Sequence, residues 1–212
     1  MTAAVHTGAW PAGVWTRVVG ELEPMTRAGH RASVAVPERP EVRDATVAEL
    51  VRAARAGSPT AFTGLYQRFH RAVHAVALAR VQMSDAGDVV QDVFADAWQK
   101  LPALREPAAF PGWLMTMARH RAIDVARRRR PVAPAEELSL GPTPRAEAQA
   151  ALDAIRGLPE TYRETLIMRL VEGLNGPEIA ERTGMTPDSV RVHLCRGLKL
   201  LRQRLDGEGT NS

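Results

Sequence analysis

The chain has 212 residues, of which 45% are hydrophobic, 5% aromatic and 25% charged, with a formal net charge of +4. This length allows one or two domains, and so few aromatic residues disfavour a β-sandwich or barrel. A single cysteine excludes a disulfide framework and a thiol-based zinc cluster within one chain. No apolar run approaches the ~18 residues of a membrane span, and no secretory signal is visible. We therefore expect a cytoplasmic protein without membrane insertion.

The distribution of proline predicts the organisation of the chain. Proline breaks helix interiors, so stretches without it are where long helices fit. The pattern predicts an all-α fold of two small helical domains. In chain order, we expect a disordered N-terminal extension at 1–45, a first domain at 46–130 and a flexible linker at 131–149. A second domain follows at 150–206, and a tail at 207–212 ends the chain. Met25 is an alternative start of the chain.

The first predicted domain contains a helix with an acidic face. From about Ser84 to Leu101, apolar residues recur at helical spacing on one face. Another face carries four aspartates: Asp85, Asp88, Asp92 and Asp96. Two interpretations stay open. The face is either solvated, with its early acids favouring the helix N-terminus, or it docks on a basic partner protein.

The last predicted helix of this domain is strongly basic at its end. Between Arg119 and Arg130 there are six arginines and one acid, Asp124. A basic helix end complements the helix dipole, but six arginines exceed what that requires. Arginine pairs with phosphates in a forked geometry, so the pattern favours nucleic acid or another polyanion.

The second predicted domain ends in a pattern typical of a helix-turn-helix. Asn175 and Glu178 are spaced as a capping box, Gly184 suits the turn, and Thr186 caps the next helix. On that helix we expect a buried stripe of Val190, Leu194, Leu198, Leu201 and Leu205. The opposite face is polar and cationic, which predicts a helix that enters the DNA major groove.

Catalytic and metal signals are weak. His70 and His74 are one helical turn apart but lack a third ligand nearby, and Cys195 lacks a suitably placed histidine partner. No phosphate loop or dinucleotide fingerprint is present. We expect no enzyme activity, no metal and no cofactor, and we disfavour a helical metal-dependent hydrolase built on the aspartates.

Both predicted domains resemble those of a bacterial RNA polymerase sigma factor of the extracytoplasmic-function (ECF) type. Residues 85–98 and 113–127 are similar to region 2 of that family, and residues 158–166 and 175–205 are similar to region 4. The resemblance covers about 46–205 and lacks the middle domain, which is the ECF arrangement. It implies a protein that binds core RNA polymerase, recognises the −10 and −35 promoter elements and initiates transcription.

The resemblance also implies residue roles. The helix that docks on the clamp helices of the largest polymerase subunit would use Asp85, Asp88, Gln91, Asp92, Phe94, Asp96 and Trp98. The −10 element would be contacted by Arg119, His120, Asp124, Arg127, Arg128, Arg129 and Arg130. The −35 element would be read by Thr186, Ser189, Arg191, Val192, Cys195, Arg196 and Lys199.

Further partners follow from the same resemblance: the polymerase flap region and an anti-sigma factor. In this family the loop at 102–111 captures a flipped base. The chain departs from the usual pattern at His120, where Asn is common, and at Val192, where Ser is common. Val192 offers a thymine methyl contact in place of a hydrogen bond. The alternative function is a stand-alone helix-turn-helix regulator.

Overall fold

The described part of the chain is built from helices. The computed structural model describes residues 45–128 and 144–208. The first unit comprises α3 (Val47–Arg55), α4 (Pro59–Leu78), α5 (Met83–Lys100), the 3₁₀ turns η2 (Leu101–Ala103) and η3 (Pro107–Ala109), and α6 (Phe110–Arg128). The second comprises α7 (Pro144–Arg156), α8 (Glu160–Leu170), α9 (Gly176–Thr183) and α10 (Pro187–Glu208). The described ranges contain no strand, which confirms the all-α prediction. None of their helices is both long and apolar enough to cross a membrane.

Local capping explains where the first helices begin. Thr46 and Glu49 form a capping box at the start of α3, with the Thr46 backbone N–H donating to the Glu49 carboxylate at 2.7 Å. Gly57, at φ +91°, turns the chain after α3, and Ser58 caps α4. The second unit begins earlier than expected, because α7 starts at Pro144 and not at 150. The last six residues of the predicted linker are therefore helical.

The core of the first unit forms around α4. This helix buries Leu65, Phe69 and Val73, and the Phe69 ring meets Phe110 of α6 edge-on at 5.2 Å between centroids. The apolar face predicted for α5 is buried as expected. The opposite face of α5, which the two interpretations concern, lies outside this core except at Asp85.

The second unit packs α10 closely against α8. Gly197 of α10 lies so close that a Cβ there would be 3.0 Å from Leu166 and 3.1 Å from Tyr162. Val190 and Leu201 are buried as predicted, whereas Leu198 is 40% exposed. The prediction was wrong for Leu198.

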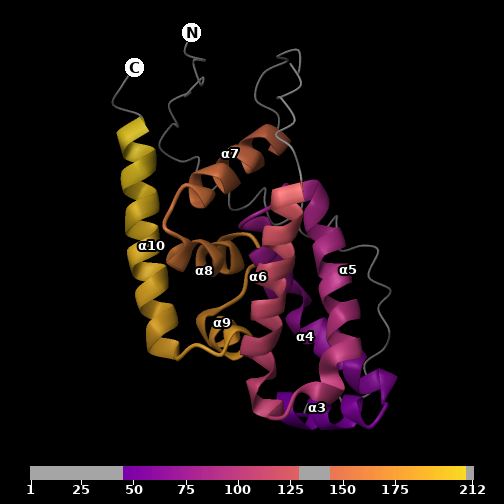
Figure 1. Cartoon of the computed structure of the whole chain (residues 1–212). Helices are drawn as coiled ribbons and strands as arrows, with labels where there is room; N and C mark the ends of the chain where they lie inside the picture. Colours follow the sequence, from indigo (N-terminus) through magenta and orange to yellow (C-terminus); the bar gives the residue numbers. More distant parts are fainter. Residues whose placement is uncertain (1–44, 129–143, 209–212) are drawn as a thin grey trace.

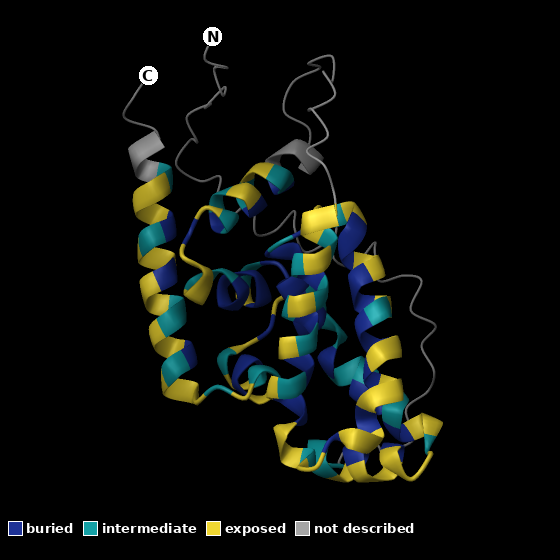
Figure 2. Cartoon of the chain, viewed as in Figure 1, coloured by how far each residue is buried: buried dark blue, intermediate teal, exposed yellow. Residues whose placement is uncertain are grey.

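The two units also pack against each other. Helix α4 contacts α8 and α9, and α6 contacts α9. Figure 1 places α8 and α9 between α10 on one side and α6 on the other. Figure 2 shows exposed residues along the outer side of α10. Helices α10 and α5 thus lie on opposite sides of the described molecule (Figure 1).

Candidate nucleic-acid interface

The turn between α9 and α10 has the predicted helix-turn-helix geometry. The Glu178 N–H donates to Asn175 Oδ1 at 2.9 Å, and the Asn175 N–H donates back to Glu178 Oε2 at 2.8 Å. Gly184 ends α9 at φ +73°, a left-handed conformation that favours glycine. The Ser189 N–H donates to the Thr186 hydroxyl at 3.2 Å and so caps α10. These three local signals confirm the prediction for this segment.

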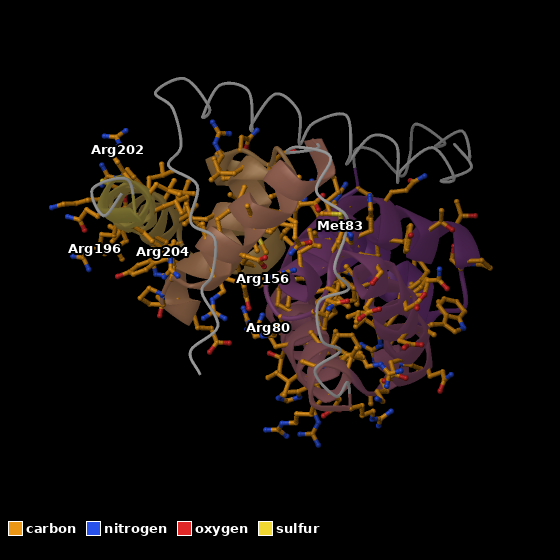
Figure 3. All side chains as sticks on the ribbon, turned by 90° about the horizontal axis from the view of Figure 1, so that it is seen from above. Arg80, Met83, Arg156, Arg196, Arg202 and Arg204 are labelled. Carbon is orange, nitrogen blue, oxygen red and sulfur yellow. The ribbon has the colours of Figure 1, made fainter. Side chains whose placement is uncertain are left out.

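The outer face of α10 is polar and cationic. The residues predicted to read DNA are exposed, except for the partly buried Ser189, and comprise Thr186, Arg191, Val192, Cys195, Arg196 and Lys199. Arg191 pairs only with a near neighbour, donating to Asp188 at 3.2 Å. Figure 3 shows Arg196 and Arg202 on α10, at the side of the molecule away from the first unit. This helix therefore presents donors, a free thiol and a valine methyl surface to an outside partner.

The basic end of α6 contains both exposed residues and a residue that pairs within the protein. His120, Asp124, Arg127 and Arg128 are exposed. Arg119 is half-buried and holds the carboxylate of Glu164 on α8 in a fork, with Nε to Oε1 at 3.0 Å and Nη2 to Oε2 at 2.8 Å. Hydrogen bonding to Glu164 raises the pKa of the Arg119 guanidinium, and the carboxylate charge acts the same way.

The remaining residues predicted for the −10 contact, Arg129 and Arg130, lie outside the described residues.

The acidic helix α5 is less uniform than its sequence suggests. Asp88 and Asp96 are exposed, but Asp85 is buried, with 5% of its surface accessible. Asp92 accepts hydrogen bonds from Arg121 of α6, and this pairing raises the pKa of Arg121. The four aspartates therefore do not form one continuous exposed face, and the repulsion expected among them is relieved by Arg121 at Asp92 and by Lys100 at Asp96.

The other α5 residues predicted to meet a partner divide in the same way. Gln91 is exposed, and Phe94 is buried in the core. Trp98 is 40% exposed, and its ring packs edge-on against Phe62 at 4.8 Å. A large aromatic side chain held in place yet open to solvent is typical of a contact surface.

Two buried carboxylates were missed by sequence reasoning. Glu164 accepts hydrogen bonds from Arg119, and it is also paired at 2.7 Å with Arg80, which follows the end of α4. Glu172 accepts from His74 Nδ1 at 2.6 Å. The signal that was available for Glu164 is its spacing, because Ile167 and Met168, one turn further along α8, are buried on the same face.

No metal site emerges in the described ranges, where no group of three histidine, cysteine or acidic side chains is placed to hold an ion. His74 is hydrogen-bonded to Glu172. His70 Nδ1 lies 3.1 Å from the Tyr66 carbonyl oxygen and 3.0 Å from that of Gln67. The two histidines therefore serve packing and pairing within the fold.

Two family models match the chain in the order expected for the resemblance. Sigma-70 region 2 matches residues 65–132, which include α5 and α6. Sigma-70 region 4 matches residues 148–201, which include the helix-turn-helix. Each match covers most of one of the two packed units described above.

Curated relatives carry the same description. The RNA polymerase sigma factor SigV of Bacillus subtilis is 30% identical over 129 residues, which are 58% of this chain and 78% of SigV. The ECF RNA polymerase sigma-E factor of Haemophilus influenzae is 27% identical over 74% of this chain and 93% of that protein. The sigma factor RfaY of Xanthomonas campestris pv. campestris is 32% identical over 72% of this chain, which spans 42% of RfaY.

A solved structure, that of CnrH in complex with the cytosolic domain of CnrY, contains a chain that is 25% identical in sequence to this one. The match covers 76% of this chain and 97% of the solved chain, with a TM-score of 0.54. Family models, curated relatives and fold therefore agree. The chain belongs to the bacterial RNA polymerase sigma factors of the ECF type.

Proposed function

We propose that this sigma factor divides its work among three surfaces: α5 docks on core RNA polymerase, the basic end of α6 contacts the −10 element, and α10 reads the −35 element. The observation that carries the proposal is the exposed cationic face of α10, the second helix of a capped helix-turn-helix. The two other surfaces are assigned from their charge and from the family.

The docking surface on α5 is narrower than the sequence suggested. Asp88, Gln91, Asp96 and Trp98 are the exposed members, and they meet a basic surface of the polymerase clamp helices. Asp85 and Phe94 act from within, because both are buried and support the helix that presents the others. Asp92 is oriented by Arg121.

DNA contacts are assigned by chemistry. Arg191 and Arg196 offer donors to guanine edges or phosphates, and Val192 packs against a thymine methyl group. On α6, Arg127 and Arg128 hold the phosphates of the −10 element, with Arg119, His120 and Asp124 on the same helix. The loop at 102–111, which lies between α5 and α6, receives a flipped base.

The chain acts as a binding subunit with no chemistry of its own, in the cytoplasm where polymerase and DNA meet. A protein partner that regulates it, an anti-sigma factor, is part of the proposal, because the related CnrH was captured with the cytosolic domain of CnrY. The exposed surfaces on α5 and α10 are open to such a partner.

Charge reversal at Asp88 tests the docking surface. Asp88→Arg places a cation on the exposed face of α5, so we expect about tenfold weaker retention on immobilised core polymerase, from like-charge repulsion. Asp88 is preferred to Asp92, whose replacement would also remove the partner of Arg121.

Asp153→Arg is the matched control, because it changes the net charge equally at an exposed position of α7, where the carboxylate accepts hydrogen bonds from Gln149 and Arg156 of its own helix. It should bind as the wild type does. Normal retention of Asp88→Arg would contradict the assignment of α5.

A further inference from the structure

His193 on α10 has an enclosed ring nitrogen, Nδ1, that finds no hydrogen-bond partner among the described residues. The side chain as a whole is half-buried. Its ring meets the Tyr162 ring of α8 edge-on, with 5.7 Å between the ring centroids. A buried polar group without a partner is rare in folded proteins and calls for an explanation. In a histidine, that explanation must account for both ring nitrogens.

The unpartnered Nδ1 decides which ring nitrogen carries the proton. A neutral imidazole has one N–H donor and one acceptor nitrogen, and the surroundings select between them. A proton on Nδ1 would be a buried donor without an acceptor, which proteins tolerate less often than an idle acceptor. We therefore assign the proton to Nε2, which is not enclosed and has no hydrogen bond to any described residue. His193 thus offers a neutral N–H donor to an outside partner.

The position of His193 along α10 places this donor beside the reading face. Ser189 lies one turn before it and Arg196 nearly one turn after it, on the same side of the helix. Both are assigned above to the −35 element, and Figure 3 shows Arg196 at the side of the molecule away from the first unit. Val190 and Gly197, in contrast, are buried. His193 therefore lies at the border between the buried and the exposed sides of α10.

The border of a reading helix is where the DNA backbone lies. The major groove is about 12 Å wide and admits one α-helix, so the outer face of the helix meets base edges and its flanks meet the groove walls. Those walls are sugar and phosphate, which receive at least about half of all protein–DNA hydrogen bonds. The short His193 ring is held against Tyr162 and cannot extend toward the base edges as Arg196 can. A phosphate oxygen is the acceptor that fits its Nε2.

We propose that His193 Nε2 donates a hydrogen bond to one phosphate of the −35 element and thereby fixes the register of α10 in the groove. This inference rests on the proposed function of α10. The contact positions the helix without neutralising a phosphate charge, which distinguishes it from a contact made by an arginine. The Tyr162 ring holds the imidazole in place before DNA arrives, so little side-chain freedom is lost on binding.

Three substitutions at His193 separate the hydrogen bond from packing. In His193→Gln the amide nitrogen can take the place of Nε2, whereas in His193→Asn it falls near the place of Nδ1. His193→Leu keeps an apolar side chain against Tyr162 and has no donor. Binding is measured with core polymerase and the full chain, on the promoter fragment that this holoenzyme transcribes most strongly. The Leu and Asn variants should bind about fivefold more weakly, which is the loss of one neutral hydrogen bond, and His193→Gln within about twofold of the wild type.

The salt dependence of binding is a second readout. Each phosphate that a cation neutralises contributes about −0.9 to the slope of log affinity against log salt concentration. A neutral donor contributes nothing to this slope, so His193→Leu should bind more weakly with the slope of the wild type. A slope that is shallower by about 0.9 in His193→Leu would overturn the neutral contact.

A phosphate scan locates the contact. One phosphate of the −35 element at a time is replaced by an uncharged methylphosphonate, which removes an acceptor oxygen. At one position the replacement should weaken binding of the wild type about fivefold more than binding of His193→Leu. Parallel losses for the two proteins at every position would overturn the phosphate contact. Equal losses in His193→Gln, His193→Asn and His193→Leu would also overturn it, because they would mark a packing role.

A second fragment with a scrambled −35 element separates this inference from the proposed function. A wild-type holoenzyme that binds both fragments equally overturns the assignment of α10, and the His193 contact with it. A wild type that prefers the intact element, with His193→Leu and His193→Asn binding as tightly, overturns the contact alone. Circular dichroism of each full chain checks that it is folded. If His193→Asn fails to fold, His193→Leu and the phosphate scan decide the question.

Discussion

Several charged residues of this protein form ion pairs between helices. Arg121 of α6 holds Asp92 of α5, and Arg119 holds Glu164, while Arg127 and Arg128 stay open to solvent. The arginines of one basic helix therefore have different tasks. Those on its inward side fasten neighbouring helices, and those near its end remain available to phosphate groups.

Gly184 is the residue on which the helix-turn-helix depends most. Its φ of +73° is one that a side chain disfavours, so we expect Gly184→Ala to lower the free energy of unfolding by about 1 kcal/mol. Gly176→Ala is the control, because nothing lies within 4 Å of a Cβ at that position and its φ is not positive. Urea unfolding followed by circular dichroism measures both, and equal stability of the two variants would contradict this account of the turn.

At the residue scale, the contacts that could be predicted from the sequence are those with a local cause. The Asn175 capping box and the Gly184 turn were predictable because their partners lie within a few positions. The pairing of Arg119 with Glu164 spans 45 positions, and that of His74 with Glu172 spans 98. Nothing in local spacing predicts contacts of that range. Leu198 was misassigned because periodicity marks a face without saying how wide the covered part is.

At the scale of elements, α10 combines two roles on opposite sides. Its inner side meets α8 so closely that Gly197 has no room for a larger residue without movement of Leu166. Its outer side carries the exposed arginines (Figure 3). A rigidly packed helix with a free polar face suits direct reading of base edges, because the reading side chains keep a fixed register.

Arg196 tests the reading face of α10. Arg196→Ala should weaken binding to a DNA fragment with its −35 element by about 5- to 100-fold, the effect of losing one bidentate base contact. Arg202→Ala removes the same charge from a different side of the helix and should change binding little. Competition binding of holoenzyme to labelled promoter DNA measures the two, and equal losses would show that α10 contributes charge without reading sequence.

The helices themselves were largely predictable, but the start of the second unit was not. Apolar periodicity and proline positions placed α4, α5 and α6 nearly where the structure has them. Helix α7 begins within the expected linker, because Pro144 is tolerated in the first turn of a helix as well as in a loop. A proline cluster alone does not distinguish these two settings.

At the scale of the whole molecule, the net charge of +4 conceals a division of surfaces. Acidic α5 and cationic α10 lie on different sides of the molecule. Charged residues between them, such as Arg80 and Glu164, form ion pairs that link the two units. The two outer surfaces were predictable from composition and family resemblance. The packing of the units was not, because a predicted flexible linker gives no information on whether the domains it joins touch each other.

The most direct test of the central claim is promoter-directed transcription in a purified system. Bacterial core polymerase is incubated with fragments of the source genome, with and without the full chain, and the 5′ ends of the transcripts are mapped. The account predicts discrete starts that require the chain and that share sequence elements about 10 and 35 base pairs upstream. Identical starts with and without the chain, or starts that share no upstream element, would contradict it.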